Sequence, residues 1–82
     1  MRKPKLPRII VRKLEGNTAG LACKEANTIE LDPRISGPQE RLRVVIHEAL
    51  HLADWKMSER KVDFRSRRIS EILWKQGYRK KK

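Results

Sequence analysis

Apolar residues cover so much of one helical segment that this segment has to lie at the centre of the fold. Between Gln39 and about Lys56, apolar side chains recur every three or four residues, as on the buried face of an α-helix. They are Leu42, Val45, Ala49, Leu52 and Ala53, and Val44, Ile46 and Leu50 widen the apolar surface. A helix with so wide an apolar surface normally has neighbours on more than one side. We therefore expect it to form the core of the protein.

Residues with strong terminal preferences delimit this helix and predict a second one. Ser36 is a favourable N-cap, Pro38 is tolerated in the first turn, and Gln39 follows Ser36 by three residues, as in a capping box. Ser58 can cap the second helix, and Gly77 is a natural stop at its end. The apolar stripe predicted for the second helix comprises Val62, Ile69, Ile72 and Leu73, with Trp74 near its end.

Short strands are predicted ahead of the helices. The β-branched residues 9–11 lie between a proline and a Gly-Asn turn signal, which indicates a strand. Polar and apolar residues alternate from Thr28 to Leu31, so we predict a second strand with Ile29 and Leu31 facing inward and Glu30 facing outward. Residues 20–26 are ambiguous. The predicted fold class is α+β, with short antiparallel strands followed by two helices.

Chain length and cysteine content limit the class of protein. A chain of 82 residues forms one small domain, here expected at residues 8–78, and such a domain buries only about 60% of the unfolded surface. Small domains therefore often need a metal or another staple. Cys23 is the only cysteine, which excludes an internal disulfide and predicts a reducing, cytoplasmic location. The chain contains no apolar run of the roughly 18 residues that would cross a bilayer, so we expect no membrane partner.

Positive charge dominates the chain. Lys and Arg number 21 against 10 Asp and Glu, for a formal net charge of +11. The cations gather in residues 1–7 and 79–82, which we expect to be flexible basic tails, and on the last helix. Such tails can bind nucleic acid without sequence preference. The sequence has no helix-turn-helix signature and no run of aromatics among basic residues, so specific base reading is not indicated.

Residues 47–51 read His-Glu-Ala-Leu-His and lie inside the central predicted helix. Residues four apart project from the same side of a helix, so His47 and His51 can present two imidazoles to one metal ion. Glu48 is rotated away from them by one residue, which keeps it near a water on the metal without making it a ligand. This pattern predicts a Zn²⁺ site in which Glu48 is the general base.

Catalytic zinc usually takes a third protein ligand, and three acids are candidates. Glu59 begins the next helix and has the reach to fold back across the intervening turn. Asp54 lies on the face of the histidines but is short and one turn further along, and Asp63 lies one turn beyond Glu59. An acid that is not a ligand can still accept the second ring N–H of a metal-bound histidine, a role that suits Asp54.

The stretch Val45–Asp54, followed by Ser58-Glu59-Arg-Lys-Val62, resembles the small gluzincin-type metallopeptidases. It is most similar to the minimal domains related to the ImmA/IrrE group, which occur in phages and bacteria. The resemblance implies a minimal zincin-like fold, hydrolysis of a peptide or protein substrate, and Glu59 as the third ligand. It also implies that Thr28–Leu31 is an edge strand that pairs with an extended substrate. The alternative is a non-catalytic, zinc-stabilised basic module that binds nucleic acid or a partner protein.

Overall fold

A three-stranded sheet comes first in the chain and two helices follow it, which confirms the predicted α+β class. The computed structural model describes residues 5–78, so residues 1–4 and 79–82 of the expected tails lie outside the described range. The elements are β1 (Arg8–Val11), β2 (Gly20–Cys23), β3 (Thr28–Leu31), α1 (Gly37–Ala53) and α2 (Glu59–Lys75). Neither helix is both long and apolar enough to cross a membrane; this finding covers residues 5–78.

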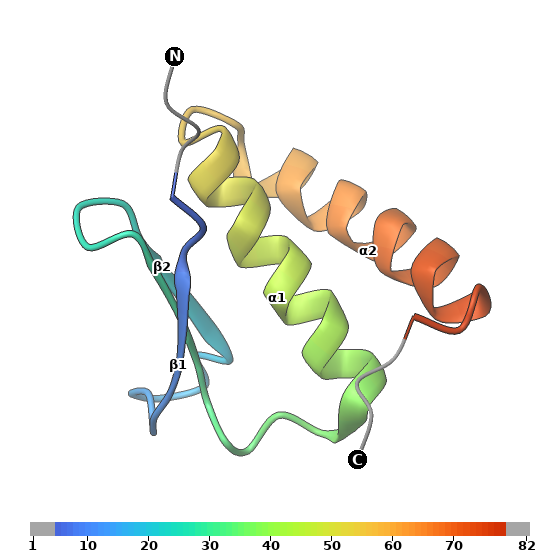
Figure 1. Cartoon of the computed structure of the whole chain (residues 1–82), viewed down its shortest axis with the longest axis horizontal. Coiled ribbons are helices and arrows are strands. Elements are labelled where there is room, and N and C mark those ends of the chain that lie inside the picture. Colours follow the sequence, from blue (N-terminus) through green and yellow to red (C-terminus); the bar gives the residue numbers. More distant parts are fainter. Residues whose placement is uncertain (1–4, 79–82) are drawn as a thin grey trace.

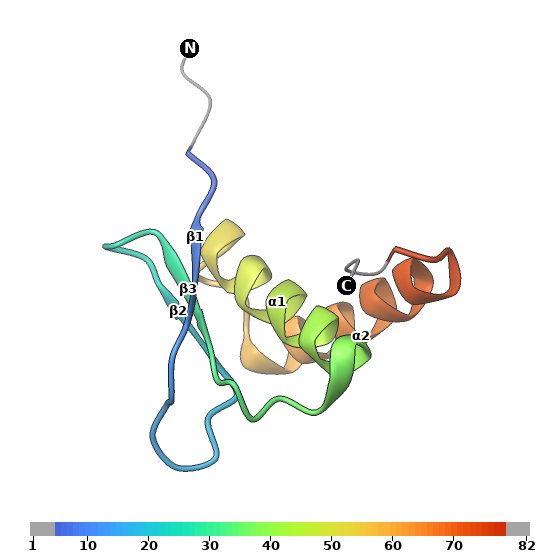
Figure 2. The same cartoon turned by 60° about the horizontal axis from the view of Figure 1, so that its bottom comes forward.

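The elements form three layers, with the sheet on one side, α1 in the middle and α2 outside it (Figure 1). The turned view in Figure 2 shows the same order. α1 contacts β2, β3 and α2, whereas α2 packs against no described element except α1. Val44 of α1 is buried against Ile29 and Leu31 of the sheet. The central position predicted for the first helix is therefore confirmed.

The sheet is mixed, so the prediction of purely antiparallel strands was wrong. Its order is β1-β3-β2. β2 and β3 are antiparallel because only residues 24–27 join them, and the chain reverses there with Asn27 at a φ of 53°. β1 lies on the other side of β3 and runs parallel to it, with Arg8 opposite Thr28 and Val11 opposite Leu31. The ambiguous segment 20–26 contributes the third strand.

β3 is the central strand, which overturns the expectation that Thr28–Leu31 is an edge available to a substrate. The backbone of Thr28, Ile29, Glu30 and Leu31 pairs with β1 on one side and β2 on the other. The inward orientation of Ile29 and Leu31 is confirmed, because both are almost completely buried. Within residues 5–78, the outer side of β2 has no strand neighbour, so β2 is the free edge that lies against α1.

α1 begins and ends earlier than predicted. Ser36 is its N-cap, but its hydroxyl makes no capping hydrogen bond, so the expected capping box is not formed. Gly37 has a φ of 79°, which turns the chain between the Ser36 side chain and the first helical turn. The helix ends at Ala53, because Asp54 leaves the helical conformation with a φ of −143°.

Both predicted ends of α2 are confirmed, whereas its predicted apolar stripe is only partly buried. The Ser58 hydroxyl accepts the Lys61 N–H at 3.2 Å, and Gly77, at a φ of 87°, terminates the helix in a Schellman motif. Val62 is buried, but Ile69 and Ile72 are 38% and 57% exposed. The reason is that α2 has a single neighbour, α1, and therefore buries only one narrow face. That face includes Val62, Ser66 and Ser70.

Asp32 fastens the end of β3 to the loop that follows β1. Its buried carboxylate accepts the Leu14 N–H at 2.7 Å, the Arg34 N–H at 2.7 Å, and two hydrogen bonds from the Arg34 guanidinium at 2.8 Å. The hydrogen bonds from the Arg34 side chain, and then the one from the Leu14 amide, hold the pKa of Asp32 well below its usual range. The carboxylate therefore stays charged in the folded protein far into acid.

Replacing Asp32 by Asn is expected to lower stability at neutral pH and to flatten the loss of stability in acid. Because the pKa of Asp32 is lower folded than unfolded, its contribution is complete above the ordinary Asp pKa of about 3.9 and is lost as the pH falls below that value. Urea unfolding midpoints of parent and variant, measured from neutral pH to about pH 2, test this expectation. Two curves that stay parallel across the acid range would contradict it.

Candidate metal centre

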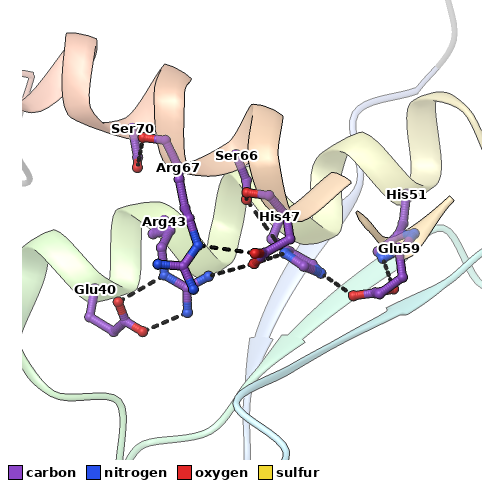
Figure 3. A network of polar contacts seen from close by, with 9 residues as sticks. Glu40, Arg43, His47, His51, Glu59, Ser66, Arg67 and Ser70 are labelled. Carbon is purple, nitrogen blue, oxygen red and sulfur yellow. Dashed lines mark hydrogen bonds and ion pairs between the residues drawn. The ribbon is translucent and has the colours of Figure 1, made fainter. Parts of the chain in front are cut away.

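Two histidines of α1 and one glutamate of α2 converge at one end of the helix pair. His47 and His51 lie one turn apart on the face of α1 that meets the start of α2, and Glu59 is the first residue of α2. Glu59 Oε1 lies 2.7 Å from His47 Nε2, and Glu59 Oε2 lies 2.9 Å from His51 Nε2 (Figure 3). One donor atom from each residue can be chosen so that all three lie within 4.8 Å of one another. This group can hold a metal ion.

The turn after α1 decides which acid joins the histidines. Asp54 instead accepts the Lys56 N–H at 3.2 Å within this turn, so the suggestion that Asp54 is a ligand or supports a histidine was wrong. Because that turn is short, it returns the chain with Glu59 directly beside the two imidazoles. Of the three candidates, only Glu59 has a carboxylate in the donor group.

Asp63 lies behind the donor group. Its carboxylate accepts the Arg67 Nε–H at 3.0 Å, and its nearest oxygen is 4.0 Å from His47 Nδ1 and 3.8 Å from the Arg43 guanidinium. Arg43 also binds both carboxylate oxygens of Glu40, at 2.9 and 2.6 Å (Figure 3). This ionic network joins α1 to α2 directly beside His47.

Ser66 is a residue of the site that the sequence analysis missed. Its side chain is completely buried, its hydroxyl donates to the Asp63 carbonyl at 3.0 Å, and it lies 3.5 Å from His47 Nδ1. When Nε2 of His47 faces a metal, Nδ1 carries the proton and can donate to the Ser66 oxygen. The signal was present, since Ser66 follows Glu59 by two helical turns and therefore lies on the same face.

Glu48 is buried between α1 and the edge strand β2, with only 9% of its surface exposed. Burial raises its pKa, while the charges of His47 and His51 and the amide of Ala22 act in the opposite direction. The carboxylate is not among the metal-binding donors but is adjacent to them in the sequence and in the structure. It is thus placed to exchange a proton beside a metal rather than to bind the metal.

An open hollow of about 380 Å³ gives access to the site. One wall is the edge strand, with Gly20, Leu21 and Ala22, and the other carries the HExxH residues and Glu59. Trp55 lies at one end and is 48% exposed, with the Lys24 ammonium 6.0 Å from its ring centre. We expected Trp55 to be a core or half-buried anchor, and it contributes to this hollow instead.

Gly20 allows β2 to approach the site closely. A Cβ added at this position would lie 2.6 Å from Val44 Cγ1, and 3.0 and 3.1 Å from Cγ and Oε2 of Glu48. Such distances are too short for unbonded atoms, so a side chain at position 20 would separate the strand from α1. The glycine is therefore a requirement of packing beside Glu48.

Replacing Gly20 by Ala is expected to destabilise the fold by about 1–3 kcal/mol, the usual cost of overpacking, and to displace Glu48. Urea unfolding measures the first effect, and a crystal structure of the variant the second. Replacing the exposed Leu21 next to it by Ala is a matched control that adds no volume. A Gly20→Ala variant with the stability of the parent and an unmoved Glu48 would contradict this expectation.

Compared with protein-family models, curated proteins and solved structures, the chain has no significant match.

Proposed function

We propose that this protein is a zinc-dependent peptidase. The observation that carries the proposal is the convergence of His47, His51 and Glu59 beside a buried carboxylate that is not itself a metal ligand. The HExxH pattern and its resemblance to the small gluzincin-type metallopeptidases point to the same reaction class.

Zinc fits the donor set of this site. Two imidazoles and one carboxylate are a known ligand set for catalytic zinc, and they leave a fourth position open. Ligands about 2.0–2.1 Å from a tetrahedral zinc ion lie about 3.3 Å apart. The present separations of 2.7 and 2.9 Å between Glu59 and the histidines need to widen by only a few tenths of an ångström. When bound, zinc would polarise the scissile carbonyl and acidify a water molecule.

The proton transfers of the reaction fall to Glu48. It takes a proton from the attacking water and passes it to the leaving amine, as a general base and then a general acid. Its burial keeps solvent away from the carboxylate, and its raised pKa favours retention of the proton between the two transfers. Ser66 holds the ring of His47 through Nδ1.

An extended peptide is the substrate class that fits the hollow. The free edge of β2 offers backbone donors and acceptors along one wall, so a peptide can add to the sheet as a further strand. Leu21 and Trp55, both about half exposed, provide apolar contacts for its side chains. The proposal places the protein in the reducing cytoplasm, where its single cysteine stays a thiol.

A non-catalytic zinc module is the second candidate, and the net charge of +11 favours it. In this case zinc would join α1 to α2 as a staple, and the basic surface would carry the function. The experiment that separates the two candidates is incubation of the zinc-loaded protein with a mixture of peptides, followed by mass spectrometry. Cleavage that a chelator stops and added zinc restores is the expected result. A folded, fully zinc-loaded protein that cleaves nothing would leave the non-catalytic module.

A further inference from the structure

The outward side of α2 carries a row of cations without acidic partners. We call it the cationic face, which consists of Arg60, Lys61, Arg65, Arg68 and Lys75. All five side chains are exposed, and within residues 5–78 none of them forms an ion pair. The only hydrogen bond of these side chains runs from Arg65 to the Met57 sulfur, at 3.8 Å. Their charges are thus available to a ligand.

Large apolar side chains lie among these cations. Phe64 is 65% exposed and Ile72 is 57% exposed. At about 100° per residue, Arg60 and Arg65 are about 140° apart around the helix, and Phe64, Arg68 and Ile72 all project between them. The face therefore has cations along both sides and a middle strip of one cation between two apolar groups. Glu71, the acid nearest to this face, lies beside Arg60 at its margin.

The cationic face is free to enter a groove. α2 is the outermost layer of the molecule and packs only against α1 among the described elements (Figure 2). Its 17 residues make a rod about 25 Å long. The major groove of B-form DNA, about 12 Å wide, admits one α-helix.

We propose that the cationic face of α2 binds duplex DNA by lying in the major groove. The cations at the sides contact the phosphates of the two groove walls, and the middle strip meets the groove floor. There Phe64 and Ile72 can contact thymine methyl groups and Arg68 can bind guanine. The Glu59 end of the buried face points toward α1, so DNA binding does not depend on metal or on peptidase activity.

The arrangement of side chains distinguishes DNA from two other polyanions. The major groove of duplex RNA is too deep and narrow for side chains to read. A helix that lies in a membrane surface needs its apolar residues on one side and its cations on the other. On the cationic face, Arg68 separates Phe64 from Ile72, so inserting both into lipid would carry a guanidinium with them.

The experiment compares two triple variants that both lower the formal charge from +11 to +8. The test variant is K61Q/R65Q/R68Q on the cationic face. The control is R8Q/K13Q/K24Q, which removes three exposed cations from the sheet and its loops. Binding of the full chain to a DNA duplex of about two helical turns is measured by fluorescence anisotropy over a range of salt concentrations. Circular dichroism shows that each variant is folded.

We expect the test variant to bind DNA at least about tenfold more weakly, and its slope of log K against log salt to fall by up to about 2.7, at about 0.9 per lost phosphate contact. The control should stay close to the parent. A Phe64→Ala variant should bind more weakly with an unchanged salt slope. If both triple variants weaken binding equally, the charge is diffuse and the proposal fails.

Two further probes can also overturn the proposal. A duplex RNA of the same length should bind more weakly than DNA, and equal affinity with the same dependence on α2 would exclude the major groove. Vesicles of phosphatidylcholine and phosphatidylglycerol should not bind through α2. If they do, and duplex DNA does not, the partner of the cationic face is a membrane surface.

Discussion

Replacing Glu48 by Gln is expected to leave zinc binding intact and to lower kcat for peptide hydrolysis by about a hundred- to ten-thousand-fold, the usual contribution of a general acid–base group. Glutamine has nearly the same shape as glutamate and fills the same buried space. It cannot take up a proton at the pH of the reaction. Because Glu48 lies outside the donor group of His47, His51 and Glu59, the metal content should stay at the parent value.

The measurement is kcat and KM for a peptide found by the cleavage screen, together with the zinc content of the same sample. Glu25→Gln is a matched control, since Glu25 is exposed in the turn between β2 and β3 and has no ion pair within residues 5–78. It should retain the activity of the parent. A Glu48→Gln variant that cleaves as fast as the parent would remove Glu48 from the mechanism.

Replacing Glu59 by Gln, or His51 by Ala, is expected to abolish most of the zinc-dependent gain in thermal stability. Zinc binds only the folded arrangement of three donors from two helices, so it stabilises that arrangement. At a free concentration of 100 times Kd, the gain is about 2.7 kcal/mol. For a domain of this size it raises Tm by roughly 10–20 °C. Melting curves with zinc and with a chelator measure the gain in parent and variants.

Two substitutions serve as controls for this experiment. Glu71→Gln removes an exposed carboxylate from the same helix as Glu59, and Asp54→Asn removes the acid nearest to His51 in sequence. Both variants should keep one zinc per chain by elemental analysis and the full rise in Tm. Loss of zinc in Asp54→Asn together with its retention in Glu59→Gln would reverse the ligand assignment.

The metal-binding residues could be predicted because their arrangement depends mainly on local geometry. His47 and His51 share one side of α1 as soon as that segment is helical, since four residues make about one turn. Glu59 required only that the next helix start directly after a short turn, which Ser58 marks by capping. Ser66 was missed because its contact with His47 depends on how closely α2 packs against α1.

The arrangement of the strands could not be predicted in the same way. Alternation showed that Ile29 and Leu31 face inward, but it says nothing about which strands lie on either side of β3. Residues 28–31 were therefore placed at an edge, whereas β1 and β2 enclose them. The close approach of Gly20 to Glu48 follows from this order, because it is β2 that lies against α1.

The sequence by itself determined the two helices, the inward faces of the sheet and the spacing of the two histidines. Each of these depends on side-chain periodicity or terminal preferences within about twenty residues. Only the tertiary structure decided the parallel pairing of β1, the identity of the edge strand and the exposure of Phe64, Ile69 and Ile72. These properties depend on which distant surfaces meet, and an apolar residue is buried only where another element covers it.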